Sequence, residues 1–193
     1  IMGNRRIGRK RLYAVEKAGQ LINLESGAGI AKAIKSATQH RNGQEIITEI
    51  QVDLEGPSGT DILGGGTNKS IGEASGKTYL TQLTEAKFGI ITEIRAVLVE
   101  ALATQADVDV RVGPDIEAKG EAVGGSGATV VVDGLADLGE DITNSNPLPA
   151  ALQTSSSEMY LYLTNGDSDT NAVAITGGKV LIYIHGFAAP ADL

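Results

Sequence analysis

Acidic and amide side chains near the C-terminal end are the first residues of this chain whose spacing suggests chemistry. Asp167, Asp169 and Asn171 have the spacing that opens a calcium-binding loop of the EF-hand type. Ala172 stands where that loop needs a glycine, and Gly178 stands where it needs a bidentate glutamate. We therefore favour an ordinary hairpin loop rich in Asp and Asn, and calcium binding in another loop geometry stays an open alternative.

A second segment, from Gly72 to Thr78, matches part of a phosphate-binding loop. Its last three residues, Gly76-Lys77-Thr78, fit that motif. The motif needs four residues between its two glycines, however, and Ile71 stands where the first glycine should be. The preceding residues form a polar, Gly-rich stretch instead of a strand, so we expect no nucleotide site and no cofactor.

The remaining candidates for catalysis are few. The chain has two histidines, His40 and His185, and it has no cysteine and no tryptophan. Neither histidine accompanies a serine-centred nucleophile motif or a positioned carboxylate, so a structural or surface role is expected for both. The acidic cluster between Asp133 and Asp141 lacks any histidine and is expected to be solvated loop charge. We predict no catalytic residue, no metal site and no enzymatic activity.

Charge is distributed unevenly along the chain. Residues 1–17 contain six cationic side chains and one carboxylate, a net charge of +5, whereas the whole chain of 193 residues carries −8. The acidic remainder would repel phosphate, so specific nucleic-acid binding is not expected. No apolar run approaches the ~20 residues needed to cross a membrane. The basic arm is expected to dock on an acidic partner surface, with a solvated terminus as the alternative. The predicted docking residues are Arg5, Arg6, Arg9, Lys10 and Arg11.

The elements that carry these segments are mostly strands. A short helix is expected over residues 26–40, because apolar side chains recur at helical spacing from Ile30 to Ala37, and Asn42-Gly43 would close it. From residue 44 the period changes to two, which predicts a half-buried strand over 46–54. Residues 56–77 are expected to form an exposed loop.

Further strands follow with short, Gly-rich connections. Residues 90–101 are apolar on both faces, which indicates a strand covered on both sides or one whose second face meets another subunit. By propensity, residues 93–102 also fit a helix, which is the alternative to a strand there. Residues 107–112 alternate Val with charged residues, which predicts one solvent-exposed face. Residues 133–150, with their two prolines, are expected to lack regular pairing. The other expected strands span 79–83, 129–132, 158–164, 172–176 and 179–187, the last three as a meander of hairpins. Alternation in the last strand places Val180, Ile182 and Ile184 together on its inward face.

About eight strands, few helices and Gly-rich connections indicate an all-β fold. We predict an antiparallel β-sandwich, jelly-roll-like, with an extended basic N-terminal arm and one short helix. Residues 1–43 would form the arm and the helix, and residues 44–193 would form the β-sandwich body. A core made mainly of Val, Ile, Leu and Ala is thin, so a homo-oligomer is expected.

Two segments resemble a known class of protein. Residues 3–13 (GNRRIGRKRLY) and residues 179–187 (KVLIYIHGF) are similar to segments of small virion structural proteins of tailed bacteriophages, particularly marine ones. The resemblance rests on a basic arm, a Gly-rich β body and a terminal strand with apolar residues, an aromatic residue and glycine. It implies a capsid decoration (cement) or minor head protein with a jelly-roll body, commonly trimeric.

The expected function is therefore a non-enzymatic one in the virion. The chain would decorate and stabilise a capsid, with the major capsid protein or another virion protein as the partner of its basic arm. The capsid surface is favoured over the tail. The alternative is a tail or fibre module that recognises the host by binding a surface glycan.

Overall fold

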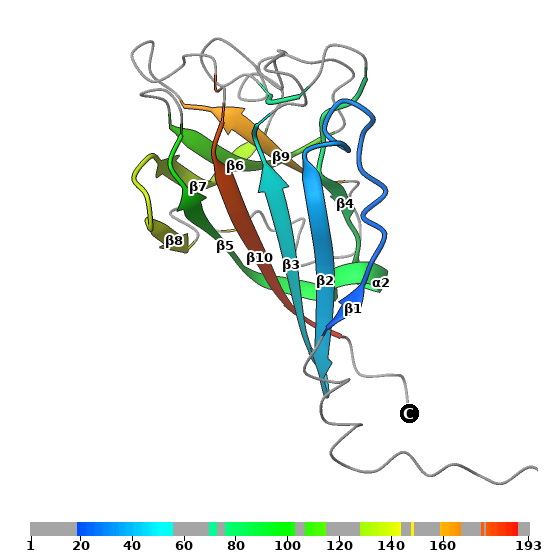
Figure 1. The fold of residues 1–193 in the computed structure, drawn as a ribbon. Coiled ribbons are helices and arrows are strands. Elements are labelled where there is room, and N and C mark those ends of the chain that lie inside the picture. Colours follow the sequence, from blue (N-terminus) through cyan, green and yellow to red (C-terminus); the bar gives the residue numbers. More distant parts are fainter. Residues whose placement is uncertain are drawn as a thin grey trace, which may run out of the picture.

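The computed structural model describes residues 19–55, 70–72, 76–102, 107–114, 128–143, 148, 159–166, 175 and 177–188. These residues form two antiparallel sheets packed face to face (Figure 1). One helix of four residues, α2 (Glu85–Phe88), accompanies them in the described part of the chain. The predicted all-β antiparallel sandwich is thus confirmed. The five predicted docking residues of the arm and the acidic loop of residues 167–171 lie outside the described residues.

Within the described residues, ten strands build the two sheets. The larger sheet contains β1 (Gln20–Leu21), β2 (Ile34–Asn42), β3 (Glu45–Asp53), β5 (Ile90–Glu100), β8 (Asp141–Thr143) and β10 (Lys179–Phe187). The smaller sheet contains β4 (Thr81–Leu83), β6 (Val108–Gly113), β7 (Thr129–Leu135) and β9 (Met159–Asn165). The strand orders are β1-β2-β3-β10-β5-β8 and β4-β9-β6-β7.

The hydrophobic core lies between the two sheets and follows the period of two along each strand. On β10, Val180, Ile182 and Ile184 all point inward, as the sequence predicted, and all three are buried. Leu161 and Leu163 of β9 face them from the smaller sheet as members of the same buried cluster. Branched aliphatic residues make up most of this core, as expected from a chain with few aromatic residues.

The helix predicted over residues 26–40 is wrong, because residues 34–42 form β2. A β-bulge interrupts the pairing of β2 with β3 between Ile34 and Ser36. The bulge brings Ile34 opposite Val52 and Ala37 opposite Ile50, so two residues three apart face the core together. That spacing imitates a helix in the sequence. Asn42-Gly43 belongs to the β2–β3 hairpin, with Gly43 at φ +63°.

The predicted meander at the C-terminal end is also wrong. β9 pairs with β4 and β6 in the smaller sheet, whereas β10 pairs with β3 and β5 in the larger one. The chain therefore crosses from one sheet to the other between β9 and β10. Most of the strand predicted over residues 172–176 lies outside the described residues. Within residues 133–150, where no pairing was expected, β8 pairs with β5.

Candidate functional site

The outer face of the larger sheet, the side turned away from the smaller sheet, is the candidate functional site. Directly opposite residues of antiparallel neighbours point to the same side of a sheet, so the pairing register defines rows across this face. Tyr183 of β10, for example, lies between Glu49 of β3 and Arg95 of β5. One complete row across six strands consists of Leu21, Thr38, Glu49, Tyr183, Arg95 and Thr143.

Apolar side chains on the outer face are only partly buried. Ile47 of β3 and Leu181 of β10 are half-buried, and Leu181 lies opposite Val97 of β5. At the lower end of the sheet, Phe187 lies opposite Ile90, with 46% and 38% of their surfaces exposed. No described part of the chain covers the apolar second face predicted for β5, where Val99 is 42% exposed.

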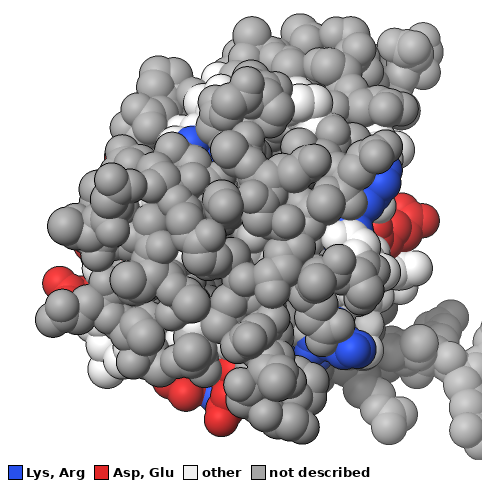
Figure 2. Space-filling view, turned by 90° about the horizontal axis from the view of Figure 1, so that it is seen from above, with Lys and Arg blue, Asp and Glu red and all other residues white. Residues whose placement is uncertain are grey.

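Ion pairs neutralise three of the carboxylates on this face. The Lys35 ammonium lies 3.7 Å from Asp53, Lys179 pairs with Glu100, and Arg95 forms a two-pronged pair with Asp141. The Arg95 hydrogen bond holds the pKa of Asp141 below its usual value. In the view from above (Figure 2), described blue and red side chains likewise lie close together at several points of the rim.

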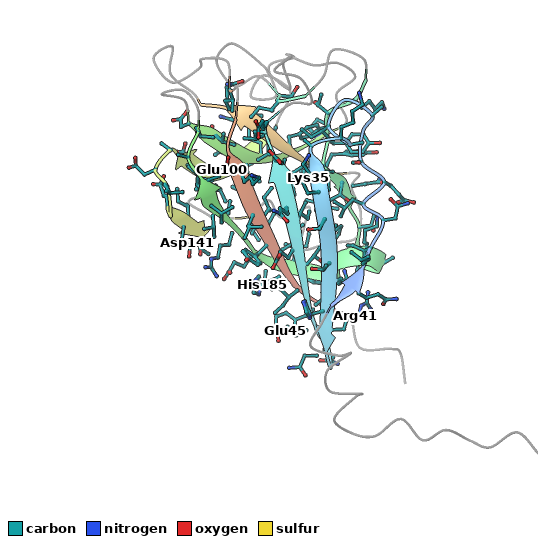
Figure 3. All side chains as sticks on the ribbon, in the orientation of Figure 1. Lys35, Arg41, Glu45, Glu100, Asp141 and His185 are labelled. Atoms are coloured by element: carbon teal, nitrogen blue, oxygen red, sulfur yellow. The ribbon has the colours of Figure 1, made fainter. Side chains whose placement is uncertain are left out.

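Three other glutamates of the outer face have no such partner. Among the described residues, no Lys or Arg forms an ion pair with Glu45, Glu49 or Glu93. Glu93 has the imidazole of His185 3.8 Å from its carboxylate. In Figure 3, Glu45 and His185 lie in the lower half of the sheet, whereas Lys35 and Glu100 lie near its upper end. Arg41, which Figure 3 also labels at the lower end, lies opposite the core residue Ile46 and is therefore on the other side of the sheet. The lower half of the outer face is thus the acidic half.

Tyr183 lies at the centre of this face. The Arg95 guanidinium carbon is 5.4 Å from the centre of the Tyr183 ring, within range of a cation–π interaction. Partial burial, followed by the nearby negative charge of Glu49, raises the pKa of the Tyr183 hydroxyl.

The basic arm joins the structure beside this acidic half. Gly19, the first described residue, has φ +70°, and a Cβ added there would come within 2.7 Å of the His40 ring. His40 in turn lies opposite Ile47 on the outer face. β1 then adds two residues to the edge of the sheet. Sequence reasoning missed this contact because it placed His40 in a helix.

A groove of about 460 Å³ lies between β1 and α2, next to this entry point. Its lining combines apolar residues such as Leu21 and Ile22 with polar ones such as Gln39 and Lys87, and several of the polar groups form hydrogen bonds near the groove. The Gln39 Nε2 donates hydrogen bonds to the Lys87 carbonyl at 2.8 Å and to the Thr48 hydroxyl at 3.1 Å. The Lys87 ammonium donates to the Glu25 carboxylate at 3.0 Å. These contacts fix α2 against the larger sheet.

The charged side chains of Asp109 and Arg111 are buried in the smaller sheet, where the sequence predicted a solvent-exposed face. All six residues of β6 are buried, so the prediction of one solvent-exposed face over residues 107–112 is wrong. Asp109 accepts a hydrogen bond from the Arg111 guanidinium at 3.0 Å and another from the backbone N–H of Gly134 at 2.9 Å. Arg111 also donates to the Thr164 hydroxyl at 3.0 Å. Burial raises the pKa of Asp109 to about 6, against the opposing effects of Gly134 and Arg111.

The other candidates from the sequence are not brought together into a reactive site. His40 and His185 both lie on the outer face, on β2 and β10. Thr78 leads into β4 and not into a helix. Glu140 accepts backbone hydrogen bonds from Ala136 and Asp137 in the turn before β8. Within the described residues, no three His, Asp or Glu side chains are grouped so that they could hold a metal ion.

Comparison with known proteins gives no family for this chain. No protein-family model matches it, and no significant match was found among curated proteins or solved structures. No helix in the described part of the chain has the length and apolar character that crossing a membrane requires.

Proposed function

We propose that this chain is a non-enzymatic structural protein of a bacteriophage virion. In this proposal it decorates and stabilises the capsid, and its basic N-terminal arm docks on the major capsid protein or another virion protein. The chain forms a homo-oligomer, with a trimer favoured. The observation that carries the proposal is the order of the strands in the two sheets.

The strand order supports the jelly-roll part of the proposal. The strands from β3 to β10 are arranged as 3-10-5-8 in one sheet and 4-9-6-7 in the other. Two interleaved Greek keys produce this order, in which the chain crosses repeatedly between the sheets. Eight-stranded jelly rolls occur in viral capsid proteins, and also in lectin domains and cupins. The fold is therefore compatible with a virion role but does not distinguish it from these other classes, so the proposal also depends on the properties of the surface.

The outer face of the larger sheet favours contact with another protein. The outer face carries half-buried aliphatic side chains bordered by ion pairs, and Val99 of β5 is 42% exposed. Exposed apolar side chains gathered on one flat sheet face are typical of a surface that meets another protein. The buried Asp109–Arg111 pair has its polar atoms satisfied within the chain, which suits a structural role better than a catalytic one.

Glycan binding by a tail or fibre module is the second candidate, because lectin domains share the jelly-roll architecture. Tyr183, the aromatic ring on the outer face next to a carboxylate, is the residue that favours it. One side of this ring is already covered by Arg95. A sugar stacking on that side would have to displace the guanidinium, so the geometry weakens this alternative.

Copy number in the purified particle tests the proposal. Virions of the phage that encodes the chain are purified and analysed by quantitative mass spectrometry against the major capsid protein. Hundreds of copies per virion would support capsid decoration. A few copies would place the chain in the neck or tail, and absence from the particle would refute a virion role.

A further inference from the structure

We infer that the acidic half of the outer face binds the chain's own basic segment, residues 5–17, within the same molecule. This contact needs no second protein, so it is independent of the proposed virion role. Four observations carry the inference: the location of the uncompensated carboxylates, the point where the segment joins the sheet, its reach, and its charge.

The uncompensated carboxylates lie together. Glu45 and Glu49 are on the same side of β3, with Ile47 between them, and Glu93 lies across His185 from Ile47. The three ion pairs of the outer face involve other carboxylates. The lower half of the face therefore carries three carboxylates with which no described Lys or Arg forms an ion pair, next to half-buried apolar surface. Arg95 interacts with Glu93 only through its longer-range charge.

The basic segment joins the sheet at the end of a row that crosses this region. Gly19 lies against His40, His40 lies opposite Ile47, and Ile47 lies opposite His185. Gly19 has the left-handed backbone conformation (φ +70°) that permits a sharp change in chain direction, and a Cβ at this position would collide with the His40 ring. The chain is thus able to turn onto the outer face immediately before β1.

The segment is long enough to reach all three glutamates. Thirteen extended residues span about 40 Å, because each contributes at most about 3.3–3.6 Å. Neighbouring strands are about 4.8 Å apart, so β5, four strand spacings from β1, lies within about 20 Å. A segment tethered this closely has an effective concentration in the millimolar range, which favours contact within the molecule over capture of a segment from solution.

The charge and apolar character of the segment match the face. Residues 5–17 contain six cationic side chains, among them Arg9 and Arg11, and guanidinium groups bind carboxylates in a two-pronged geometry. Leu12, Tyr13 and Val15 provide apolar side chains for the surface around Ile47. A second copy that packed its acidic half against this acidic half would instead bring the glutamates of both copies together and be repelled. A more acidic surface on a partner would compete with this face for the segment.

Paramagnetic relaxation enhancement in NMR tests the contact, and the absence of cysteine makes the labelling clean. A nitroxide is attached to the Gly8→Cys variant of the full chain, enriched in ¹⁵N. The expected result is strong broadening of backbone amide signals from β3 and β10 around Glu49 and Tyr183, with signals of β6 and β7 in the smaller sheet retained. High salt, which shortens the Debye length to about 3 Å at 1 M, should remove the broadening.

Charge variants provide the matched control. In the labelled protein, Glu45→Gln/Glu49→Gln/Glu93→Gln should abolish the broadening. Glu55→Gln/Glu85→Gln/Asp137→Asn, which removes equal charge from exposed side chains elsewhere, should leave it unchanged. The dispersion of the amide spectrum reports whether each variant is folded, and the salt titration of the unsubstituted chain tests the same contact without any carboxylate variant.

A mixed sample separates contact within the molecule from contact between molecules. Labelled chain without ¹⁵N is mixed with ¹⁵N-enriched chain without label. The inference expects no broadening in this mixture. Broadening in the mixture would assign the segment to a neighbouring copy, and no broadening on β3 and β10 in either sample would leave the acidic face unoccupied. Either result overturns the inference.

Discussion

Asp109 and Arg111 of β6 form an ion pair, with 3.0 Å between the Asp109 Oδ2 and the Arg111 Nη2, in which both side chains are almost inaccessible to solvent. The pair lies on the side of β6 opposite the core valines Val108, Val110 and Val112. Removing two charges from water is costly, and hydrogen bonds from Gly134 and to Thr164 offset part of this cost. The pair thus links β6 to both of its neighbours, β7 and β9.

Removing one partner of this pair should destabilise the fold strongly. Arg111→Met leaves the Asp109 carboxylate buried without its cation, and such changes cost about 3–5 kcal/mol. Asp109→Leu/Arg111→Met removes both charges and should be less destabilised than Arg111→Met alone. Urea unfolding followed by circular dichroism gives the free energies of unfolding. If the single and double variants lost the same free energy of unfolding, the destabilisation would not come from leaving the Asp109 charge without its cation.

The stability of the chain should depend on pH through Asp109. Its pKa is about 6 in the folded protein, above the value of 3.8 expected in the unfolded chain. Between pH 4 and pH 6 the folded state binds more protons than the unfolded chain. The stability that protonation of Asp109 provides is therefore complete below about pH 4 and is lost as the pH rises to about 6. The loss is on the order of 3 kcal/mol. The difference in unfolding free energy between the unsubstituted chain and Asp109→Asn, measured from pH 4 to pH 7, should show this slope. A pH-independent difference would refute it.

Neutralising the basic arm should abolish docking without unfolding the body. The variant replaces Arg5, Arg6, Arg9, Lys10 and Arg11 by Gln, and its melting temperature should stay close to that of the unsubstituted chain. Its occupancy on purified particles that lack the chain should fall to background, because the arm supplies the charge that attracts an acidic surface. Lys32→Gln/Arg41→Gln, which changes exposed cations of the body, should dock normally. Undiminished occupancy of the arm variant would reject the docking role.

The upper, apolar part of the outer face should mediate self-association. Val97→Asp/Leu181→Asp places charge where two half-buried side chains lie opposite each other on β5 and β10. Sedimentation velocity should show an oligomer for the unsubstituted chain and a folded monomer for this variant. Ala136→Asp, an equivalent change at an exposed turn position, should leave the oligomer intact. A monomeric unsubstituted chain would contradict a homo-oligomer.

Local sequence patterns were sufficient for most strands but not for their partners. Alternation along β10 correctly predicted that Val180, Ile182 and Ile184 face the core. Nothing local indicated that β10 lies between β3 and β5, far from β9. Pairing between strands distant in sequence depends on which apolar faces can be buried together, and a turn such as Asn165-Gly166 only suggests a neighbour. The helix error at Ile34 and Ala37 arose because a β-bulge produced a helical spacing.

The sequence by itself determined the all-β class, the inward face of β10 and the separation of a cationic leader from an acidic body, because these follow from side-chain type and period. Only the tertiary structure decided that Asp109 and Arg111 are buried, because whether a charged side chain meets water depends on what packs over its strand. Only the tertiary structure also brought Glu49, Tyr183 and Arg95 into one row, because residues more than forty positions apart become neighbours through sheet pairing alone.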